Sequence, residues 1–417
     1  MDSTEPRASR PLDGVTVLDL TIALSGPFAT LLLAGLGARV IKVENPAGGD
    51  MSRNNAPYLG SSGVKLVRDR DDDISISAIN RLRNKLGVTL NLKHLRAGAV
   101  LGDLVRQSDI VMENFSRGVL ERLGFGYEFV RNANPRAVFC SITGFGSDGE
   151  EGSTKGLDTI IQALSGVMYA SGDPDDGPVR CGLQIADLSV ALFGVIGVLA
   201  ALHQARRTGA GQHVDVSMLG ALTSLVAGEA YDAQELCGIP LRTGRTIPRL
   251  APFGVYPASD GYVAICAPTE GFAQYLFQAM ARADFAADER FKTRDLRVKN
   301  VKALDALIEE WTRSKTMAEI ISKLDAAGVP VAEVRDPKQA VHDPRVTARQ
   351  ETVPLAHPKY GVVGNIYGSG LPIKFSESDA GFDQPPPELG EHNQAVYGGI
   401  LGYSAGEIEE MRAAGLI

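Results

Sequence analysis

The stretch GVTVLDLTIALSGPFATLLLAGLGARVIKVENP, residues 14–46, predicts a strand, a helix and a second strand in direct succession. Its first apolar and β-branched run covers residues 15–20, and the Ser-Gly-Pro sequence that begins at Ser25 is typical of a helix start with proline in the first turn. Gly37 is suited to end that helix, and residues 40–43 form the next apolar run. The stretch therefore reads as one strand–helix–strand unit.

The same alternation of short apolar runs and helical segments continues further along the chain. DIVMENF (109–115) and AVFCSITGFG (137–146) are two more such runs, with two short helical segments between them. Strands that are apolar on both faces are typical of a parallel sheet covered by helices on both sides. We therefore expect an α/β fold whose large domain is built on a parallel sheet.

Residues 188–207 are apolar nearly all round, which predicts a buried helix that ends at Gly209. The uninterrupted apolar run, residues 188–202, is 15 residues long. A helix needs about 20 apolar residues to span a bilayer. We therefore expect no membrane-spanning segment here.

The pattern of predicted strands and helices changes after about residue 225. Residues 253–267 resemble a hairpin, and helical, charged segments follow over residues 272–327. A short strand at residues 328–334 leads back. We assign residues 226–330 to a smaller α+β domain inserted into a large domain of residues 1–225 and 331–417. Near the C-terminus, Ser404 is expected to cap a last helix.

Composition limits the classes of function. The chain has 417 residues and a net charge of −8, which argues against nucleic acid or an anionic membrane as a partner. The first twelve residues lack a signal-peptide core, so we expect a cytoplasmic protein. The six histidines and four cysteines show no metal-ligand spacing, and we expect no metal. The glycine-rich stretches fit neither GxGxxG nor the P-loop, which argues against nicotinamide and ATP.

One acid stands out in VRCGLQIADLSVALFG, residues 179–194. Asp187 lies at the start of the long apolar helix, where an N-cap carboxylate typically contributes about 1 kcal/mol. A carboxylate at a helix N-terminus is also held in its charged form, and an ionised, partly desolvated carboxylate can act as a nucleophile. The local pattern alone leaves both interpretations open.

Several stretches together resemble the family III CoA-transferases, the group that includes formyl-CoA and carnitine CoA-transferases. The resemblance covers nearly the whole chain in the same order and is weakest in the small domain. The matching stretches are PLDGVTVLDLT (11–21), SGPFATLLLAGLGARVIKVENPAGGD (25–50), NKLGVTLNLK (84–93), DIVMENFSRGVLERLGFGYE (109–128), NPRAVFCSITGFG (134–146), the segment 162–218 that contains GLQIADLSVALFG, and LGEHNQAVYGGILGYSAGEIEEM (389–411).

The resemblance implies a fold, an assembly and a site. It implies a Rossmann-like large domain and an interlocked homodimer of two ring-shaped chains. Asp187 takes the place of the catalytic nucleophile, and Asp158 matches an acid that orients the site, although a cap of its own helix is an equal alternative. The positions that match the coenzyme A site and the oxyanion side are Ala23, Leu24, Lys85, Leu90, Asn91, Leu92, Lys93, Asn114, Phe115, Ser116, Arg122 and Lys155.

The chain departs from formyl-CoA transferases at three points. It has Leu24 in place of Gln and Asn45 in place of Arg, and its small domain lacks their run of consecutive glycines. These differences argue against formate and oxalate as substrates. The related α-methylacyl-CoA racemases pair the acid with a His where this chain has Leu157. Leucine cannot take a proton from carbon, so CoA transfer is favoured over racemisation.

The expected activity is therefore CoA transfer from an acyl-CoA donor to a carboxylic acid acceptor, with no permanently bound cofactor. Succinyl-CoA and a dicarboxylate are the suggested pair, because several arginines are available for a second carboxylate. The expected intermediates are an aspartyl anhydride and an aspartyl-CoA thioester on Asp187. Lys85, Lys93, Arg122 and Lys155 are expected to hold the CoA phosphates. Racemase-type α-proton chemistry and a non-catalytic CoA-binding subunit remain the alternatives.

Overall fold

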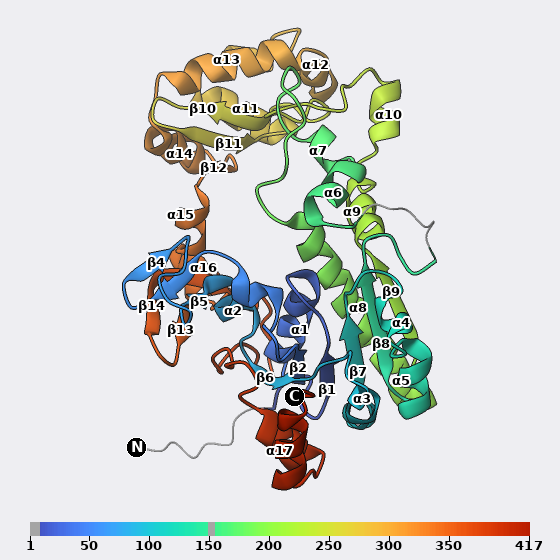
Figure 1. The fold of residues 1–417 in the computed structure, drawn as a ribbon. Coiled ribbons are helices and arrows are strands. Elements are labelled where there is room, and N and C mark those ends of the chain that lie inside the picture. Colours follow the sequence, from blue (N-terminus) through green and yellow to red (C-terminus); the bar gives the residue numbers. More distant parts are fainter. Residues whose placement is uncertain (1–8, 149–154) are drawn as a thin grey trace. The chain divides into compact units, whose positions relative to one another are not determined.

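The computed structural model describes residues 9–148 and 155–417, which divide into two compact units (Figure 1). The large unit contains Met1–Ser165, Leu183–Leu225 and Val341–Ile417. The second unit contains Gly166–Gly182 and Val226–Ala340. The second unit thus includes all of residues 226–330 and, in addition, two segments that we had expected in the large domain, Gly166–Gly182 and residues 331–340.

A six-stranded parallel sheet forms the centre of the large unit, in the order β6-β2-β1-β7-β8-β9. Numbered by their order along the chain, these strands run 3-2-1-4-5-6, the order of Rossmann sheets. The direction of winding reverses between β1 and β7, and ligands of such sheets bind outside the carboxyl ends of the strands at this point. The strands are β1 (Thr16–Asp19), β2 (Arg39–Glu44), β6 (Lys85–Thr89), β7 (Ile110–Glu113), β8 (Val138–Thr143) and β9 (His213–Ser217).

The predicted strand–helix–strand unit is confirmed. Helix α1 (Ser25–Gly35) connects β1 to β2, and Gly37 follows it with a φ of +107°, a conformation that glycine adopts without strain. One hydrophobic core lies where the sheet is covered by α3 (Ala97–Arg106), by α5 (Tyr127–Ala133) and by residues near the C-terminus such as Tyr397. Both faces of these strands are buried, as the apolar runs predict.

Helix α8 (Ile185–Thr208) contacts α1, β8 and β9, and it ends at Gly209, as predicted. The expectation of a fully buried helix is wrong, because Leu192 and Ile196 are 51% and 63% exposed. The helix is long and apolar enough to cross a membrane by length and composition, but half of its most apolar window is buried. One apolar side therefore packs on the sheet, and the other is uncovered in the single chain.

Smaller elements complete the large unit. Two of them, a three-stranded β4-β3-β5 sheet and the β13–β14 hairpin, were not anticipated from the sequence. Ser404 caps the last helix through a capping box with Glu407, as predicted. The elements are η1 (Met51–Asn54), β3 (Tyr58–Gly60), β4 (Gly63–Lys65), β5 (Ile74–Ser75), α2 (Ile76–Arg81), α4 (Val119–Arg122), α6 (Asp158–Leu164), α9 (Met218–Val226), α16 (Pro344–Thr347), β13 (Thr352–His357), β14 (Gly361–Ser369), the π-helix η3 (Gln394–Ile400) and α17 (Ala405–Ala413). Helix α15 (Pro337–Val341) lies at the boundary of the two units.

The second unit is an α+β structure with its own core. Its predicted hairpin is confirmed as the antiparallel pair β10 (Phe253–Pro257) and β11 (Tyr262–Cys266), and β12 (Val331–Glu333) adds a third strand. Aromatic rings of Phe277, Phe285 and Phe291 meet edge to face in the core beneath this sheet. The helices are α7 (Val167–Ala170), α10 (Tyr231–Leu236), α11 (Glu270–Ala279), η2 (Ala283–Ala286), α12 (Arg294–Lys299), α13 (Val301–Arg313) and α14 (Met317–Ala326).

Candidate active site

The turn between β1 and α1 leaves the sheet at its carboxyl edge, beside the reversal point. Ala23 lies in this turn with a φ of +67°, which is unusual for a residue that has a side chain. Its N–H donates to Asp50 Oδ1 at 3.2 Å, and its carbonyl accepts from Arg81 Nη1 at 3.0 Å. Gly26 allows the turn to close tightly, since a Cβ there would lie 2.2 Å from the Thr21 Cβ. The surroundings therefore hold Ala23 in a strained conformation, a feature common at functional sites.

Asn114, the first residue after β7, fastens this turn from the other side of the reversal point. Its Oδ1 accepts from the N–H of Ile22 at 2.7 Å, and its Nδ2 donates to the Ile22 carbonyl at 2.8 Å. The same Nδ2 donates to the Ser25 hydroxyl oxygen at 3.1 Å. The Asn114 side chain therefore joins the ends of β1 and β7 where a Rossmann sheet binds its ligand.

Two lysines lie fully buried beneath the turn. Lys42 Nζ is 3.2 Å from Asp50 Oδ2 and 3.7 Å from Asp19 Oδ1, and it donates to the Thr21 carbonyl. Burial alone would raise the pKa of Asp19, but the ammonium groups of Lys42 and Lys85 hold it well below its usual range. This charge network connects the end of β1 to Asp50 and so supports the position of Ala23.

Lys85 belongs to this buried network and does not fit the expected contact with a CoA phosphate. Its Nζ donates to Asp19 Oδ2 at 3.0 Å, to Thr30 Oγ1 at 2.7 Å and to the Pro27 carbonyl at 2.9 Å. Its side chain has no exposed surface, and burial lowers its pKa. Three bonds use all the donors of an ammonium group. We therefore remove Lys85 from the expected CoA-binding set.

Asp187 is the third residue of α8 and not its N-cap, which is Gln184. The cap interpretation of Asp187 is therefore wrong. Burial and the nearby Asp158 raise the pKa of Asp187 to about 6, against the opposing effects of Arg81 and of a hydrogen bond with the Ser25 side chain. From the sequence we expected the helix N-terminus to hold Asp187 in its charged form. The raised pKa shows that it does not. Instead, Asp187 is a partly desolvated acid whose pKa lies close to neutral.

Asp158 has a different set of contacts. It is the first residue of α6, whose N-cap is Leu157, so the alternative that it caps its own helix is wrong. Its Oδ1 accepts from the N–H groups of Ala186 at 2.9 Å and Asp187 at 3.4 Å. Its Oδ2 accepts from Gln162 Nε2 at 2.7 Å. Asp158 therefore satisfies free N–H groups in the first turn of α8 and anchors the segment that carries Asp187.

The other expected CoA-binding positions follow the carboxyl edge of the sheet. Leu90 is buried and donates its N–H to the Glu44 carbonyl at 2.8 Å, and Phe115 donates its N–H to Glu113 Oε2 at 2.8 Å. Residues 90–93 follow β6 and residues 114–116 follow β7, and strands β2 and β1 lie between these two strands in the sheet. The two groups therefore lie at the same carboxyl edge of the sheet but do not form one cluster. Half-buried members of the set are Ala23, Leu24, Asn91, Leu92, Asn114 and Phe115, and exposed members are Lys93, Ser116, Arg122 and Lys155.

Three of the exposed members are cations. Lys93, Arg122 and Lys155 make no ion pair with any residue that the structure describes. Unpaired cations at the mouth of a Rossmann sheet are suited to bind phosphate groups.

Three residues of the site were missed from the sequence. Ser25 follows the expected pair Ala23 and Leu24, and its proximity in the chain was an available signal. Arg81 was counted among scattered surface cations, although it holds the Ala23 carbonyl and acts on Asp187. Asp50 had no distinguishing local pattern. Within residues 9–148 and 155–417, no group of His, Cys, Asp and Glu side chains is arranged to hold a metal ion.

Known proteins resemble this chain over nearly its full length. The profile of CoA-transferase family III matches residues 12–393. Acetyl-CoA:oxalate CoA-transferase of Acetobacter aceti is 34% identical, with 95% of this chain and 97% of that protein covered. Succinate–glutarate CoA-transferase of Agrobacterium fabrum is 33% identical, with 94% and 96% covered. The crystal structure of a CAIB/BAIF family protein from Brucella suis superposes with a TM-score of 0.80 at 32% identity, covering 94% of this chain and 100% of that one.

Proposed function

The chain belongs to CoA-transferase family III and is an enzyme of that class, and on this premise we propose that Asp187 is its nucleophile. The observation that carries the proposal is the position of Asp187, which lies on α8, bonded by Ser25 at the reversal point of a Rossmann sheet and anchored by Asp158. The enzyme moves CoA from an acyl-CoA donor to a carboxylic acid acceptor. Covalent catalysis suits this exchange because the energy of the thioester is conserved in enzyme-bound acyl groups.

The first half of the reaction transfers CoA to the enzyme. A carboxylate oxygen of Asp187 attacks the thioester carbon of the donor, the C–S bond breaks, and CoA thiolate leaves an aspartyl anhydride behind. The thiolate then attacks Cγ of Asp187, the bond to the anhydride oxygen breaks, and the donor acid leaves as a carboxylate. Asp187 now carries CoA as a thioester.

The second half reverses these steps with the acceptor. The acceptor carboxylate attacks Cγ of Asp187 and displaces CoA thiolate, which forms a new anhydride. The thiolate attacks the acyl carbon of the acceptor, and the Asp187 carboxylate is regenerated with release of the new acyl-CoA. No metal, redox partner or external base enters the balance of either half.

Each tetrahedral intermediate carries an oxyanion that needs donors. The N–H groups of Ala186 and Asp187 are engaged by Asp158, so the start of α8 has few donors to offer. The N–H groups of Leu24 and Ser25 at the start of α1 have no acceptor among the described residues. These two groups, in the turn fastened by Asn114, are the better candidates for an oxyanion hole.

CoA itself must stay bound while the two acids exchange. Lys93, Arg122 and Lys155 are exposed, unpaired within the described residues and close to the carboxyl edge of the sheet. We assign the CoA phosphates to these three cations. Asn91, Leu92, Phe115 and Ser116 lie in the same two segments and complete the expected binding set.

The acceptor is best described as a dicarboxylate, with succinyl-CoA as the donor. The relatives reported above have names that contain succinate, glutarate or oxalate, all of which are dicarboxylates. A relative whose name contains oxalate is as similar as the others, so sequence identity does not support our exclusion of oxalate as a substrate. Initial rates with a panel of acyl-CoA donors and acids test this assignment, and activity restricted to neutral monocarboxylates would contradict it.

Two other functions fit the site less well. In the racemases a histidine serves as second base, and Leu157, 65% exposed at the start of α6, occupies the matching position. A leucine there leaves only one acid–base group for α-proton chemistry. A non-catalytic CoA-binding subunit would not need a supported carboxyl at position 187. Transfer activity of the purified single chain distinguishes that role from catalysis.

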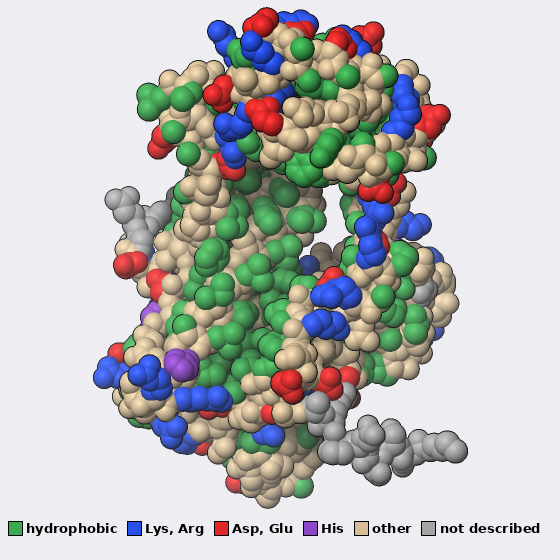
Figure 2. Space-filling model, turned by 180° about the vertical axis from the view of Figure 1, so that it is seen from behind, with side chains coloured by type: hydrophobic (Ala, Val, Ile, Leu, Met, Phe, Trp, Pro, Cys, Tyr) green, Lys and Arg blue, Asp and Glu red, His purple; other side chains and the backbone are tan. Residues whose placement is uncertain are grey.

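The assembly we propose is the interlocked homodimer of family III, with the second unit as an inserted domain. Leu192 and Ile196 on α8 and Leu164 on α6 are exposed apolar side chains of the large unit. Hydrophobic side chains also gather over a broad area of the face seen in Figure 2. Monomers seldom expose large contiguous apolar surfaces. Light scattering of the purified protein should give the mass of two chains of 44.3 kDa, and a monomer would contradict the proposal.

Trapping of the acyl-enzyme is the direct test of the nucleophile. The protein is incubated with acyl-CoA, treated with hydroxylamine or borohydride, digested and analysed by mass spectrometry. We expect the modification on the peptide that contains Asp187. A label on any other residue refutes the assignment.

A further inference from the structure

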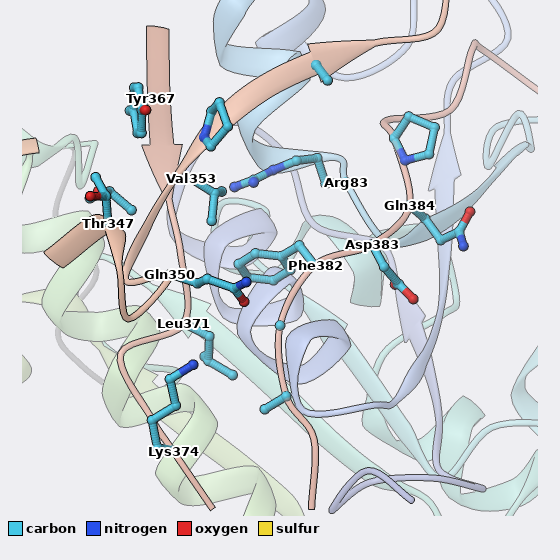
Figure 3. Close-up of a pocket in the computed structure, with 16 residues that line it drawn as sticks. Arg83, Thr347, Gln350, Val353, Tyr367, Leu371, Lys374, Phe382, Asp383 and Gln384 are labelled. Atoms are coloured by element: carbon cyan, nitrogen blue, oxygen red, sulfur yellow. The ribbon is translucent and has the colours of Figure 1, made fainter. Parts of the chain in front are cut away.

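The large unit contains a cavity that lies away from the site described above. Its volume is about 560 Å³, within the range of small-molecule sites. Residues of β13 and β14 form one wall, and residues 380–385 form another (Figure 3). Arg83 reaches this cavity from just before β6, at the amino end of the strand, whereas the Asp187 site lies at the carboxyl edge. The cavity is therefore separate from the proposed catalytic centre.

Arg83 is the unusual feature of this cavity. The residue is only 5% exposed, and Figure 3 shows its side chain near both Val353 and Phe382. Its partners are neutral: Nε and Nη2 donate to Asn80, Nη2 donates to the Ser369 carbonyl at 2.7 Å, and the guanidinium lies 4.7 Å from the centre of the Phe382 ring. It has no ion pair within residues 9–148 and 155–417, and no acceptor there for Nη1.

A buried guanidinium without a counter-ion is costly, because arginine stays charged in proteins. Burial lowers the pKa of Arg83 to about 10, which still leaves the group fully charged at neutral pH. Asp383 lines the same cavity, but its carboxylate is engaged by Asn84 Nδ2 at 3.1 Å and by Arg10 at 3.4 Å. A second cation, Lys374, also lines the cavity, is exposed, and has no ion pair among the described residues. The cavity therefore has an excess of positive charge.

The walls are held in place by contacts outside the cavity. Asn84 Oδ1 accepts from the N–H groups of Asp383 at 2.9 Å and Gln384 at 2.7 Å, which fixes the 380–385 segment to the start of β6. Asn80 Oδ1 accepts from the N–H of Ser369 at 3.2 Å and so fastens β14. The lining includes the apolar side chains of Val353, Leu371 and Phe382 beside the amide groups of Gln350 and Gln384. A preformed, partly apolar pocket with one charged anchor is the usual form of a ligand site.

We propose that this cavity is a second, non-catalytic site that binds a small organic anion, whose carboxylate or phosphate head pairs with Arg83 and whose short body packs on Val353 and Phe382. Arg83 Nη1 supplies the free donor, and Lys374 supplies a second positive charge at the rim. Because Nε and Nη2 are engaged by Asn80 and Ser369, the head group binds end-on, through charge-assisted hydrogen bonds from Nη1 alone. The assignment does not depend on the role of Asp187.

Crystals of the wild-type protein soaked separately with glutarate and with sodium phosphate test the site. We expect density for at least one of the two anions within hydrogen-bond distance of Arg83 Nη1. Binding of glutarate alone identifies a carboxylate site, and binding of phosphate alone identifies a phosphate site. Only water in both soaks, or a segment of a second copy of the chain filling the cavity, overturns the proposal.

Calorimetric titration of the same anion into variants gives the matching result in solution. Arg83→Gln should weaken the binding event about tenfold or more. Because Arg83 also bonds Asn80 and Ser369, a second variant, Val353→Phe, fills the cavity and leaves the guanidinium in place. It should weaken binding to a similar degree. Asp187→Ala and the surface variant Arg106→Gln should bind as the wild type does. Unchanged binding in both cavity variants contradicts the proposal.

Discussion

The carboxylate of Asp158 lies against the backbone of Asp187, with its Oδ1 3.4 Å from the Asp187 nitrogen and 2.9 Å from the nitrogen of Ala186. This contact anchors the first turn of α8. It also places a negative charge beside the Asp187 carboxyl, which together with burial raises the pKa of Asp187 to about 6. Two acids 29 positions apart in the chain are thus coupled: Asp158 holds the backbone of the segment that carries Asp187, the proposed nucleophile.

Replacing Asp187 tests the covalent mechanism. Asp187→Ala and the isosteric Asp187→Asn should each lower kcat for CoA transfer by about 10³-fold or more, because neither side chain can form the anhydride. Binding of CoA, measured by calorimetry, should stay within a few-fold of the wild type, since the phosphate contacts are elsewhere. Full transfer activity in Asp187→Asn would exclude this residue as the nucleophile.

The pH dependence of donor use follows from the raised pKa. The nucleophile is the ionised form of Asp187, so kcat/KM for the acyl-CoA should fall tenfold per pH unit below a midpoint of about 6. Above that midpoint the rate should level off. The measurement is the initial rate between pH 4.5 and 8 with a donor at low concentration. A rate that stays flat down to the lower end of this range would show a carboxyl with its ordinary pKa of 3.8.

Two variants should move this midpoint in opposite directions. Asp158→Asn keeps an oxygen for the Ala186 N–H but removes the charge that raises the pKa of Asp187, so the midpoint should move to lower pH. Arg81→Gln removes a charge that lowers the same pKa, so the midpoint should move to higher pH. Arg81→Lys retains the charge and is the matched control, with little shift expected. Shifts of the opposite sign would contradict the assigned electrostatics.

The raised pKa of Asp187 also makes the stability of the fold depend on pH. Ionisation of Asp187 favours activity but lowers the free energy of unfolding. The pKa of Asp187 is higher in the folded chain than its ordinary value of 3.8, so ionisation costs folding free energy as pH rises from about 4 to about 6. Asp187→Asn removes that cost and should increase the free energy of unfolding by about 3 kcal/mol at pH 8. At pH 4 the gain should largely disappear. Urea unfolding at the two pH values measures this difference, and a loss of stability at pH 8 would count against it.

The hydrogen bonds from Asn114 to the turn between β1 and α1 predict that this residue positions the turn for catalysis. Asn114→Ala removes three hydrogen bonds to the turn at Ile22 and Ser25 and should lower stability by about 1–3 kcal/mol. It should also lower kcat more than it changes the KM for the donor, because the turn supplies the expected oxyanion donors. Asn134→Ala, which removes an asparagine bonded to Ser108 outside the site, is the matched control. Equal loss of kcat in both variants would point to a general structural effect.

Local sequence patterns predicted several of the regular elements of the fold. The apolar runs at residues 15–20 and 40–43 correspond to β1 and β2, and Gly209 and Ser404 mark real helix boundaries. These features depend on neighbours in the chain, where backbone geometry and capping chemistry are local. The β13–β14 hairpin and the π-helix η3 lack such patterns and were missed.

The candidate site was harder to predict because its contacts join distant positions. In the sequence, Lys85 resembles any cation at the end of a strand. In the structure it is buried and donates to Asp19, which is 66 positions away in the chain. Arg81 and Asp50 act on Ala23 only after the sheet order brings β1 and β2 together. The family resemblance placed Asp187 and Asn114 at the site, whereas only the three-dimensional contacts show how each is held.

The exposed apolar side chains of α8 imply that enzyme activity depends on protein concentration, because dimer formation follows the law of mass action. The residue at the third position of α8 is the proposed nucleophile, and Leu192 and Ile196, further along the same helix, are the exposed apolar residues. If these side chains form the dimer contact, dimerisation also fixes the position of Asp187, because all three residues lie on the same helix. Specific activity should then decline on dilution before any loss of helical signal, and adding more of the same protein should restore it.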